Sequence, residues 1–478
     1  MLAAYCLSSF LLAGAWNTLS PIFNVAKAKF KVDSAAVSAI ALSLNLTYLP
    51  GSLLALFVCE RHGLRATLLL GSSLQLVMCF FKWAAVDLAP SPHGGYALLL
   101  AGQLLGGLGQ PLVLNTVARL TQDWFPHDER DVATSIGFQA SNLGAILFNA
   151  LPAWLVHRPA DLHALFLAQL LAWPLVLAAL AVGMPTDRPD VAPSAATAAQ
   201  WARHAAQRAR LPPGTSPGAA AVASLAADLR LLARDADFRL LVAGFSCTAG
   251  VAWALSTVEG PLIEACGYSP RVAGGAGAAL LAGGVVACAA LAPWLRASAS
   301  SRQYLPLQRR LQALCCAATA VLLVNTRPLA ARQLLLAWAA CGAAQGPLGP
   351  LTLEHAAQLT YPVPADSSSA ALFMASNLAS FAQTAAMQML LTRPVSALCL
   401  SVATPSAALV VACLLLGYLA VACMNSASRG GSPSGRPAGS DAGSAACAPS
   451  FESTTEAPDA PLLTQAHQRA SHLADECL

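Results

Sequence analysis

The chain contains the sequence ARLTQDWFPHDERDVATSIGFQASNL at residues 118–143 and the related sequence AQLTYPVPADSSSAALFMASNL at residues 357–378. The two stretches share three blocks in the same order: Ala-x-Leu-Thr, an aromatic residue followed by proline, and Ala-Ser-Asn-Leu. The proline precedes the last block by 14 residues in the first copy and by 13 in the second. Apolar sequences of similar composition can match over four residues by chance, but three matches in order indicate an internal repeat.

Outside these stretches the chain is strongly apolar. Of its 478 residues, 56% are apolar and 10% are charged, whereas a soluble globular protein carries about 25% charged residues. This deficit excludes an ordinary soluble enzyme, and it excludes disorder for most of the chain. The net charge of +4 is small and the basic residues are scattered between apolar runs, which does not support nucleic-acid binding. The composition therefore indicates a polytopic membrane protein that lies in a lipid bilayer.

The polar and reactive residues do not form the patterns of a metal site or of an enzyme. The 14 cysteines fall mostly inside apolar stretches, as small apolar side chains do. No CxxC pair and no histidine spacing predicts a metal site. No Ser–His–Asp order, nucleotide-binding loop or pair of carboxylates occurs in a pocket-like context. We therefore expect no metal, no cofactor and no enzymatic activity.

Twelve apolar runs are long enough to cross a bilayer, because a helix needs roughly 20 apolar residues to span the hydrocarbon core. They fall near residues 2–24, 35–58, 66–86, 96–118, 132–155, 162–183, 239–259, 272–295, 308–325, 332–352, 368–391 and 396–423. The runs lack the alternation of apolar and polar residues that marks membrane β-strands. With the repeat, they predict an all-α membrane protein whose twelve transmembrane helices form two six-helix halves. Parallel six-helix repeats define the major facilitator architecture, in which the substrate site lies between the halves.

The predicted organisation has four parts: an N-terminal half at residues 1–183, a central loop at 184–238, a C-terminal half at 239–424 and a tail at 425–478. The central loop is rich in Pro, Ala and Arg, and we expect a short amphipathic helix over 224–238. The tail is rich in Gly, Ser, Pro and Ala without an apolar period, which is typical of disorder.

Lysines and arginines in the connections predict the orientation, because cytoplasmic loops carry an excess of them. With both termini in the cytoplasm, fifteen basic residues lie in the inner connections and the central loop, and eight lie in the outer loops. This favours a cytoplasmic central loop and tail, although Lys27, Lys29 and Lys31 fall on the outer side. No charge precedes the first apolar run, so we expect no signal peptide. A plasma membrane location is favoured, with an organellar membrane as the alternative.

Repeat-related polar and aromatic residues inside the spans are the candidate substrate-binding residues. They form three pairs with one member in each half: Trp16 and Trp253, Asn142 and Asn377, and Gln110 and Gln345. Two tryptophan faces across a dry cavity would attract a cation by roughly 2 kcal/mol or more, and the asparagines could orient a polar end of the cargo. The glutamines lie beside Gly and Pro and could line the path. The alternatives are an interfacial position for the tryptophans and helix-to-helix hydrogen bonds for the amides.

A corner loop between the second and third spans reads Glu60-Arg61-His62-Gly63-Leu64-Arg65. Charges at such a corner can pair with neighbouring helix ends in one conformation and release them in another. Glu60, Arg61 and Arg65 are therefore candidate gating residues, together with Glu354 at the cytoplasmic end of the tenth span. The alternative is a solvated loop, since exposed ion pairs contribute only ~0–1 kcal/mol.

Other ionisable residues lie close to the ends of spans. Lys82 lies near the outer end of the third span, where we expect its amine to reach the interface by snorkelling. Glu259 and Glu264 lie at the outer end of the seventh span. They are functional candidates because ionisable groups are costly to bury in a membrane.

Two segments resemble the feline leukaemia virus subgroup C receptor-related transporters, solute carrier family 49. One runs from Trp16 to Arg65, and the other reads LEHAAQLTYP at residues 353–362. In that family the second segment carries a glutamate, a second acidic residue and then Leu-Thr-Tyr-Pro. Here Glu354 matches the glutamate and Gln358 replaces the second acidic residue. The corner loop is shared with many facilitators, and the Leu-Thr-Tyr-Pro segment is more specific.

The resemblance implies import of choline or ethanolamine, or export of haem, depending on the member, and one branch is tied to vitamin transport. In the choline-transporting members, aromatic residues of the first and seventh helices surround the quaternary ammonium. Trp16 and Trp253 stand at the matching places, the second where a tyrosine is usual. Glutamines on the fifth and eleventh helices help to hold the substrate in those members. Asn142 and Asn377 match them with shorter side chains, as in the less characterised branch of the family.

These observations predict a multi-pass membrane transporter that moves a small organic solute by alternating access, with a choline- or ethanolamine-like cation as its cargo. One alternative cargo is haem, another porphyrin or a vitamin. No His or Cys pair is placed as axial haem ligands, which argues against tight haem binding but not against passage. A further alternative is a receptor or scaffold that no longer transports and that contacts its partner through the central loop or the tail. We expect the protein to be a monomer.

Overall fold

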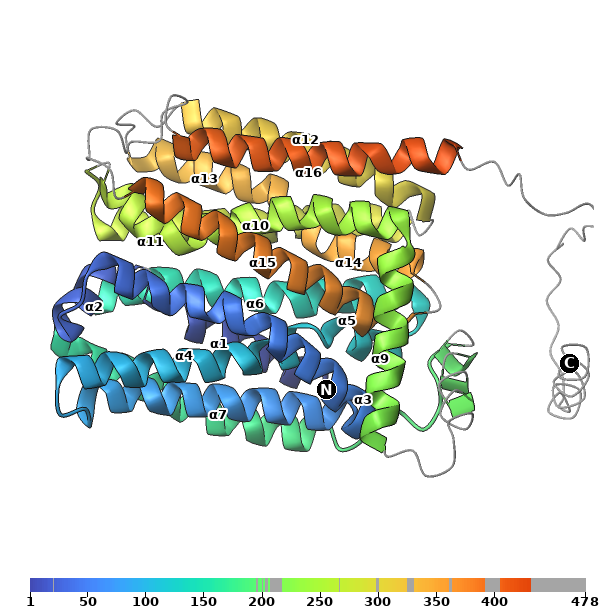
Figure 1. Ribbon diagram of the computed structural model, residues 1–478, viewed down its shortest axis with the longest axis horizontal. Coiled ribbons are helices and arrows are strands. Elements are labelled where there is room, and N and C mark those ends of the chain that lie inside the picture. Colours follow the sequence, from blue (N-terminus) through green and yellow to red (C-terminus); the bar gives the residue numbers. More distant parts are fainter. Residues whose placement is uncertain are drawn as a thin grey trace, which may run out of the picture. The chain divides into compact units, whose positions relative to one another are not determined.

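The computed structural model describes residues 1–19, 21–194, 197–199, 201–202, 205–206, 217–265, 267–297, 301–324, 331–360, 363–391 and 405–430. Met1–Gly430 forms one compact unit. The regular elements of the described residues are all helices (Figure 1). Residues 431–478, which make up most of the predicted disordered tail, lie outside the described residues.

The first half of the chain contains seven α-helices and one short 3-10 helix in its described part. They are α1 (Leu2–Asn17), α2 (Phe23–Phe30), α3 (Ser34–Asp87), α4 (Pro92–Leu114), α5 (Val117–Trp124), α6 (His127–Leu155), η1 (Pro159–Asp161) and α7 (Leu162–Gly183). The predicted second and third spans both lie in α3, on either side of Gly63. Gly63 has a φ of 86°, a left-handed conformation that glycine adopts without steric cost. The predicted corner loop is therefore a kink between two helical segments.

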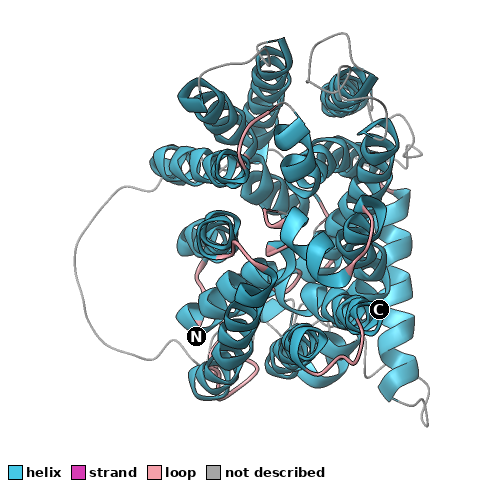
Figure 2. Ribbon diagram, turned by 90° about the vertical axis from the view of Figure 1, so that its left-hand side faces the viewer, coloured by secondary structure: helices cyan, strands magenta, loops and turns pink. Residues whose placement is uncertain are grey.

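The described residues from 217 onward form eight further helices, the first of them within the central loop. They are α9 (Pro217–Arg234), α10 (Ala236–Ala265), α11 (Pro270–Ala297), α12 (Ser301–Val324), α13 (Ala331–Gln345), α14 (Leu348–Leu359), α15 (Ala365–Leu391) and α16 (Pro405–Gly430). The helix α16 continues into the first residues of the predicted tail. Figure 2 views most of these helices end on.

Each of the twelve predicted spans contains a helix, but several ends differ. The first helix stops at Asn17, and the short helix α2 follows it. The predicted tenth span is divided between α13 and α14 at Gly346-Pro347. Six segments of the described chain are apolar and long enough to cross a membrane: Leu42–Asp87, Pro92–Trp124, Pro159–Gly183, Ala236–Glu259, Pro270–Leu291 and Ala331–Leu359.

The sequence repeat corresponds to a repeated structure. In the first half α4 gives way to the short helix α5, and α6 follows. In the second half α13 gives way to the short helix α14, and α15 follows. Both breaks lie near a proline, Pro111 in the first half and Pro347 in the second, where the missing N–H weakens the helix.

The helix α9 lies across the ends of the other helices, at the end of the bundle that we call the α9 end (Figure 1). The opposite end, which carries α2, is the α2 end. The predicted amphipathic helix over 224–238 thus begins earlier, at Pro217, and stops at Arg234. It stops there because the side chain of Asp235 accepts a hydrogen bond of 2.9 Å from the backbone N–H of Phe238. This bond caps the N-terminus of α10. The helix α10 therefore begins slightly before residue 239, the predicted start of the C-terminal half.

The helix α2 explains the three lysines that opposed the predicted orientation. Phe23, Ala26 and Phe30 form the buried face of this short helix. Lys29 donates a 3.1 Å hydrogen bond to the carbonyl of Val86, near the C-terminus of α3, where a cation is favourable. Lys27 and Lys29 therefore belong to a short folded helix at the α2 end, and Lys31 is its C-cap.

The snorkelling prediction for Lys82 is wrong. Its side chain is fully buried, and its amine donates to the backbone carbonyl of Ala15. The amine also lies 6.0 Å from the centroid of the Phe166 ring. The reason is that α1 ends at Asn17, which leaves its last carbonyl groups without partners inside the helix.

Candidate functional site

A cavity of about 970 Å³ lies between helices of the two halves. Its lining comes from α1, α3, α4, α5 and α6 of the first half and from α10, α11 and α15 of the second. A second cavity of about 680 Å³ adjoins it and shares Phe138, Asn142, Trp253, Ser256 and Leu281 with the first. The two cavities therefore form one candidate binding region.

Five of the six predicted substrate-binding residues come together in this region. Asn142, Trp253, Asn377 and Gln110 line the larger cavity, and Gln345 lines the adjoining one. Trp16 lies in the last turn of α1, but its side chain is outside the described part of the structure. The predicted pair of facing tryptophans thus stays a prediction.

Trp253 belongs to a wall of aromatic rings. Its ring stacks on that of Phe373, with centroids 6.2 Å apart and an angle of 23° between the planes. Phe373 in turn meets Phe245 edge to face, with centroids 6.4 Å apart. Because Trp253 is on α10 and Phe373 is on α15, two helices of the second half hold this wall in place. Phe373 corresponds to Phe138 in the first copy of the repeat, because each lies two residues before an Ala-Ser-Asn-Leu block, and both rings line the cavity. Sequence reasoning missed this aromatic pair, although the repeat contains the signal for it.

Two tyrosines line the opposite side of the larger cavity, from the first half. The hydroxyl of Tyr5 donates to the carbonyl of Val113 at 3.2 Å. The hydroxyl of Tyr48 donates to Oδ1 of Asn115 at 2.8 Å. Both acceptors lie where α4 breaks into α5, so the break supplies polar groups that fix the two rings. Sequence reasoning missed both tyrosines, since neither belongs to a repeated block.

The asparagines of the two Ala-Ser-Asn-Leu blocks are held by local hydrogen bonds. Asn142 donates to Oε1 of Gln139 at 2.8 Å, and Asn377 donates to the carbonyl of Phe373 at 2.9 Å. Gln139 in turn donates a hydrogen bond of 2.8 Å to the thiol sulfur of Cys288 on α11. Each asparagine donates one N–H to the protein, and its amide can present the acceptor oxygen and the second N–H to a ligand.

The larger cavity has an uncharged lining in the part of the chain that the structure describes. Its polar groups are hydroxyls and amides, and its rings are those of Tyr5, Tyr48, Phe138, Trp253 and Phe373. Nor do any three His, Cys, Asp or Glu side chains come together as a metal site among the described residues. A ligand in this cavity therefore meets aromatic faces and amide dipoles.

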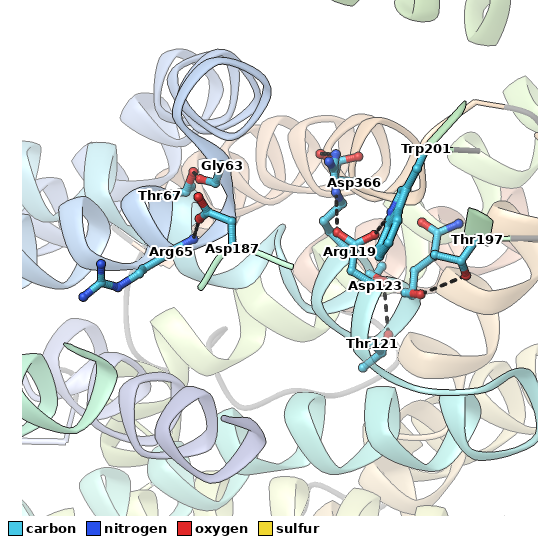
Figure 3. Close-up of polar contacts among 12 residues, drawn as sticks. Gly63, Arg65, Thr67, Arg119, Thr121, Asp123, Asp187, Thr197, Trp201 and Asp366 are labelled. Carbon is cyan, nitrogen blue, oxygen red and sulfur yellow. Dashed lines mark hydrogen bonds and ion pairs between the residues drawn. The ribbon is translucent and has the colours of Figure 1, made fainter. Parts of the chain in front are cut away.

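A buried ion pair joins the two halves at the α9 end of the cavity (Figure 3). Arg119 on α5 contacts Asp123 on its own helix at 3.0 Å. It also contacts Asp366, in the first turn of α15, at 3.3 Å. All three side chains are almost completely buried. We call Arg119, Asp123 and Asp366 the charged cluster; it joins α5 to α15.

Residues of the central loop form hydrogen bonds with Asp123 of the charged cluster and with the neighbouring Gln122. The indole N–H of Trp201 donates to Oδ1 of Asp123 at 2.9 Å. The hydroxyl of Thr197 donates to the carbonyl of Gln122 at 3.2 Å. The sequence contains one signal for the charged cluster. Arg119 is a charged residue in the first repeated block, at the position where the second copy has the uncharged Gln358.

The predicted gating residues lie on two elements, with Glu60, Arg61 and Arg65 on α3 and Glu354 on α14. The backbone N–H of Arg65 donates to Asp187 at 2.8 Å, and its guanidinium donates to the carbonyl of Ala181 at 3.4 Å. Figure 3 shows this contact apart from the charged cluster. Arg61 is exposed beside Gly218 at the start of α9. Glu354 is half-buried on α14, in the second half.

The sequence is related to known transporters. Residues 5–384 match the family model described as Major Facilitator Superfamily. Solute carrier family 49 member A3 of Danio rerio is 24% identical over 373 residues, which cover 78% of this chain and 74% of the relative. The human choline/ethanolamine transporter FLVCR2 is 26% identical over 249 residues, which cover 51% of this chain and 44% of that protein. The resemblance to solute carrier family 49 is thereby confirmed.

Solved structures share the fold. The D-xylose-proton symporter has a TM-score of 0.64 at 13% sequence identity, and the match covers 88% of this chain and 96% of that one. The Escherichia coli fucose:proton symporter FucP has a TM-score of 0.61 at 16% identity, with 88% and 98% covered. At such identities the likeness shows the fold alone, and it confirms the predicted major facilitator fold.

Proposed function

Because the chain belongs to the major facilitator superfamily, we propose that it carries a small organic cation of the choline or ethanolamine type by alternating access. The observation that supports this cargo is the uncharged cavity lined by stacked aromatic rings and asparagine amides. Two further relatives, both from Danio rerio, are named choline/ethanolamine transporters.

The lining suits a weakly hydrated cation. A ring face attracts a cation by roughly 2 kcal/mol or more when water is excluded, and Trp253 and Phe373 offer such faces from two helices. The hydroxyl of choline or ethanolamine would then bond to an amide oxygen of Asn142 or Asn377. A cation bound to a carboxylate in the cavity would be released less readily, because a buried ion pair resists separation.

The charged cluster supplies the closed end that alternating access requires. In this conformation Arg119 ties α5 to α15 at the α9 end, which the distribution of lysines and arginines predicts to be cytoplasmic. Substrate would be taken up from the α2 end and released once the contact of Arg119 with Asp366 breaks. Rocking of the two halves then exposes the cavity to the other side.

Uptake of radiolabelled choline into transporter-deficient cells tests the proposal. We expect Trp253→Ala to raise the KM for choline about tenfold or more, since loss of about 1.4 kcal/mol is a factor of ten. Trp253→Phe is the matched control because it keeps a ring face, and we expect it to lose much less. Surface biotinylation corrects for expression. Wild-type choline uptake by Trp253→Ala, or haem efflux that choline does not inhibit, would remove the cation proposal.

A further inference from the structure

Glu259 is a carboxylic acid buried in one of the apolar segments long enough to span a membrane. It ends the segment Ala236–Glu259 of α10, and its side chain is 0% exposed. It follows Ser256 by three residues, which places both on the same face of the helix. Ser256 lines both parts of the binding region. Glu259 therefore lies about one helical turn from the cavity, toward the α2 end.

The surroundings of this carboxyl are apolar. Neither of its oxygen atoms has a hydrogen-bond partner in the described part of the chain. The carboxyl lies against Gly277 of α11, where any side chain larger than hydrogen would overlap it. Val258, Ala273, Ala276 and Leu280 belong to the apolar cluster around the same helix contact.

No charged neighbour compensates for the burial. The helices packed against α10 are α3, α9, α11, α13, α14, α15 and α16. None of their described residues places a titratable or charged side chain in electrostatic contact with Glu259. The side chain of Glu264, further along α10, is outside the described residues. An ionised carboxylate without a partner is costly in such a place, so the carboxyl holds a proton in this conformation.

The helix beyond Glu259 contains a weak point. The next residues are Gly260 and Pro261, and a proline lacks the N–H that would bond to the carbonyl four residues earlier, at Thr257. Thr257 itself lines the cavity. Bending of α10 at this point would separate its outer end from α11 and admit water to the carboxyl.

We propose that Glu259 is a proton-binding site that couples transport to a proton gradient. The carboxyl binds a proton when α10 and α11 are packed as described, and it releases the proton to water when α10 bends. The coupling rests on the proposed transport function, whereas binding of the proton depends on Glu259 and its apolar surroundings alone.

Infrared difference spectroscopy of the purified full-length protein tests the proton site without any substrate. A pH titration should show the C=O band of a protonated carboxylic acid that persists above the usual range of a glutamate. This band should disappear in Glu259→Gln and in Glu259→Met. The methionine variant suits an apolar site, so it should fold even if the buried amide of the glutamine variant does not. A wild-type spectrum without the band, or the same band in both variants, overturns the proton site.

Choline uptake into proteoliposomes with and without a pH gradient tests the coupling. We expect the gradient to change wild-type uptake severalfold and to leave Glu259→Gln and Glu259→Met unchanged, while both variants keep choline exchange without a gradient. A gradient response in the variants equal to that of the wild type overturns the coupling. If the wild type takes up no choline but shows the carboxyl band, the proposed substrate fails and the proton site stands.

Discussion

Arg119 forms ion pairs with two carboxylates, and the two carboxylates have different structural roles. Asp123, four residues along the same helix, holds the guanidinium in place, while Asp366 connects it to the other half of the protein. Because all three side chains are buried, the contact between Arg119 and Asp366 is stronger than a surface ion pair. A buried pair that loses one partner is destabilised by about 3–5 kcal/mol.

We therefore expect Asp366→Asn to open the α9 end of the cavity. Cys59 is a native reporter, because it is buried in electrostatic contact with Arg119, Asp123 and Asp366. Its alkylation, measured by mass spectrometry, should become severalfold faster in Asp366→Asn. Asp33→Asn is the control at the α2 end, where Asp33 caps α3 and asparagine caps equally well. Equal rates in the wild type and Asp366→Asn would contradict a closing role for the charged cluster.

At the scale of elements, the apolar runs predicted that helices exist but not where they break. The tenth span was predicted as one helix, yet it is divided at Gly346-Pro347. The corner at Gly63 was predicted as a loop, yet only one residue leaves the helical conformation. Such breaks depend on what packs against the helix. At Gly63 that neighbour is Asp187, which is far away in the sequence.

The helix α9 is an element whose position should depend on pH. Asp228 on α9 accepts a 3.4 Å hydrogen bond from the hydroxyl of Ser367 on α15. Burial and, after it, the negative charges of Asp366 and Glu60 together raise the pKa of Asp228 from 3.8 to about 6. The docked helix thus binds a proton more tightly than the undocked one. This contribution to docking is fully present below the undocked pKa of 3.8, and it is lost as the pH rises from there through about 6.

Hydrogen exchange over residues 217–234 measures this dependence. After correction for intrinsic rates, the amides should be better protected at pH 5 than at pH 7.5. Asp228→Asn keeps the shape of the side chain without its charge, and protection in this variant should no longer depend on pH. Protection that rises with pH in the wild type would show that Asp228 acts in the opposite sense.

At the scale of the whole molecule, the repeat predicted both the fold and most of the binding region. It paired Asn142 with Asn377 and Gln110 with Gln345, and these four residues line the adjoining cavities. It could not predict the charged cluster, because Arg119 and Asp366 have no equivalent pair in the other copy. The contact of Arg119 with Asp366 is asymmetric, so a comparison of the halves with each other does not reveal it.

The approach of the halves depends on small residues where α6 meets α11. A Cβ at Gly274 would lie 2.7 Å from the backbone oxygen of Asn149 on α6, whereas one at Gly275 would make an ordinary contact with Leu335. We expect Gly274→Ala to cost about 1–3 kcal/mol through overpacking and to reduce choline uptake. Gly275→Ala is the matched control and should behave like the wild type. Thermal unfolding and uptake of both variants decide whether this close approach matters.

The absence of fixed charge around the cavity, in the described part of the chain, has an electrical consequence. Nothing in that lining neutralises a cationic cargo, so the cargo would take its full charge across the bilayer, and each crossing that moves no compensating proton would be electrogenic. A membrane potential of about 100 mV changes the free energy of one elementary charge by about 2.3 kcal/mol. The potential alone would then support a roughly fiftyfold accumulation of the cation on the negative side.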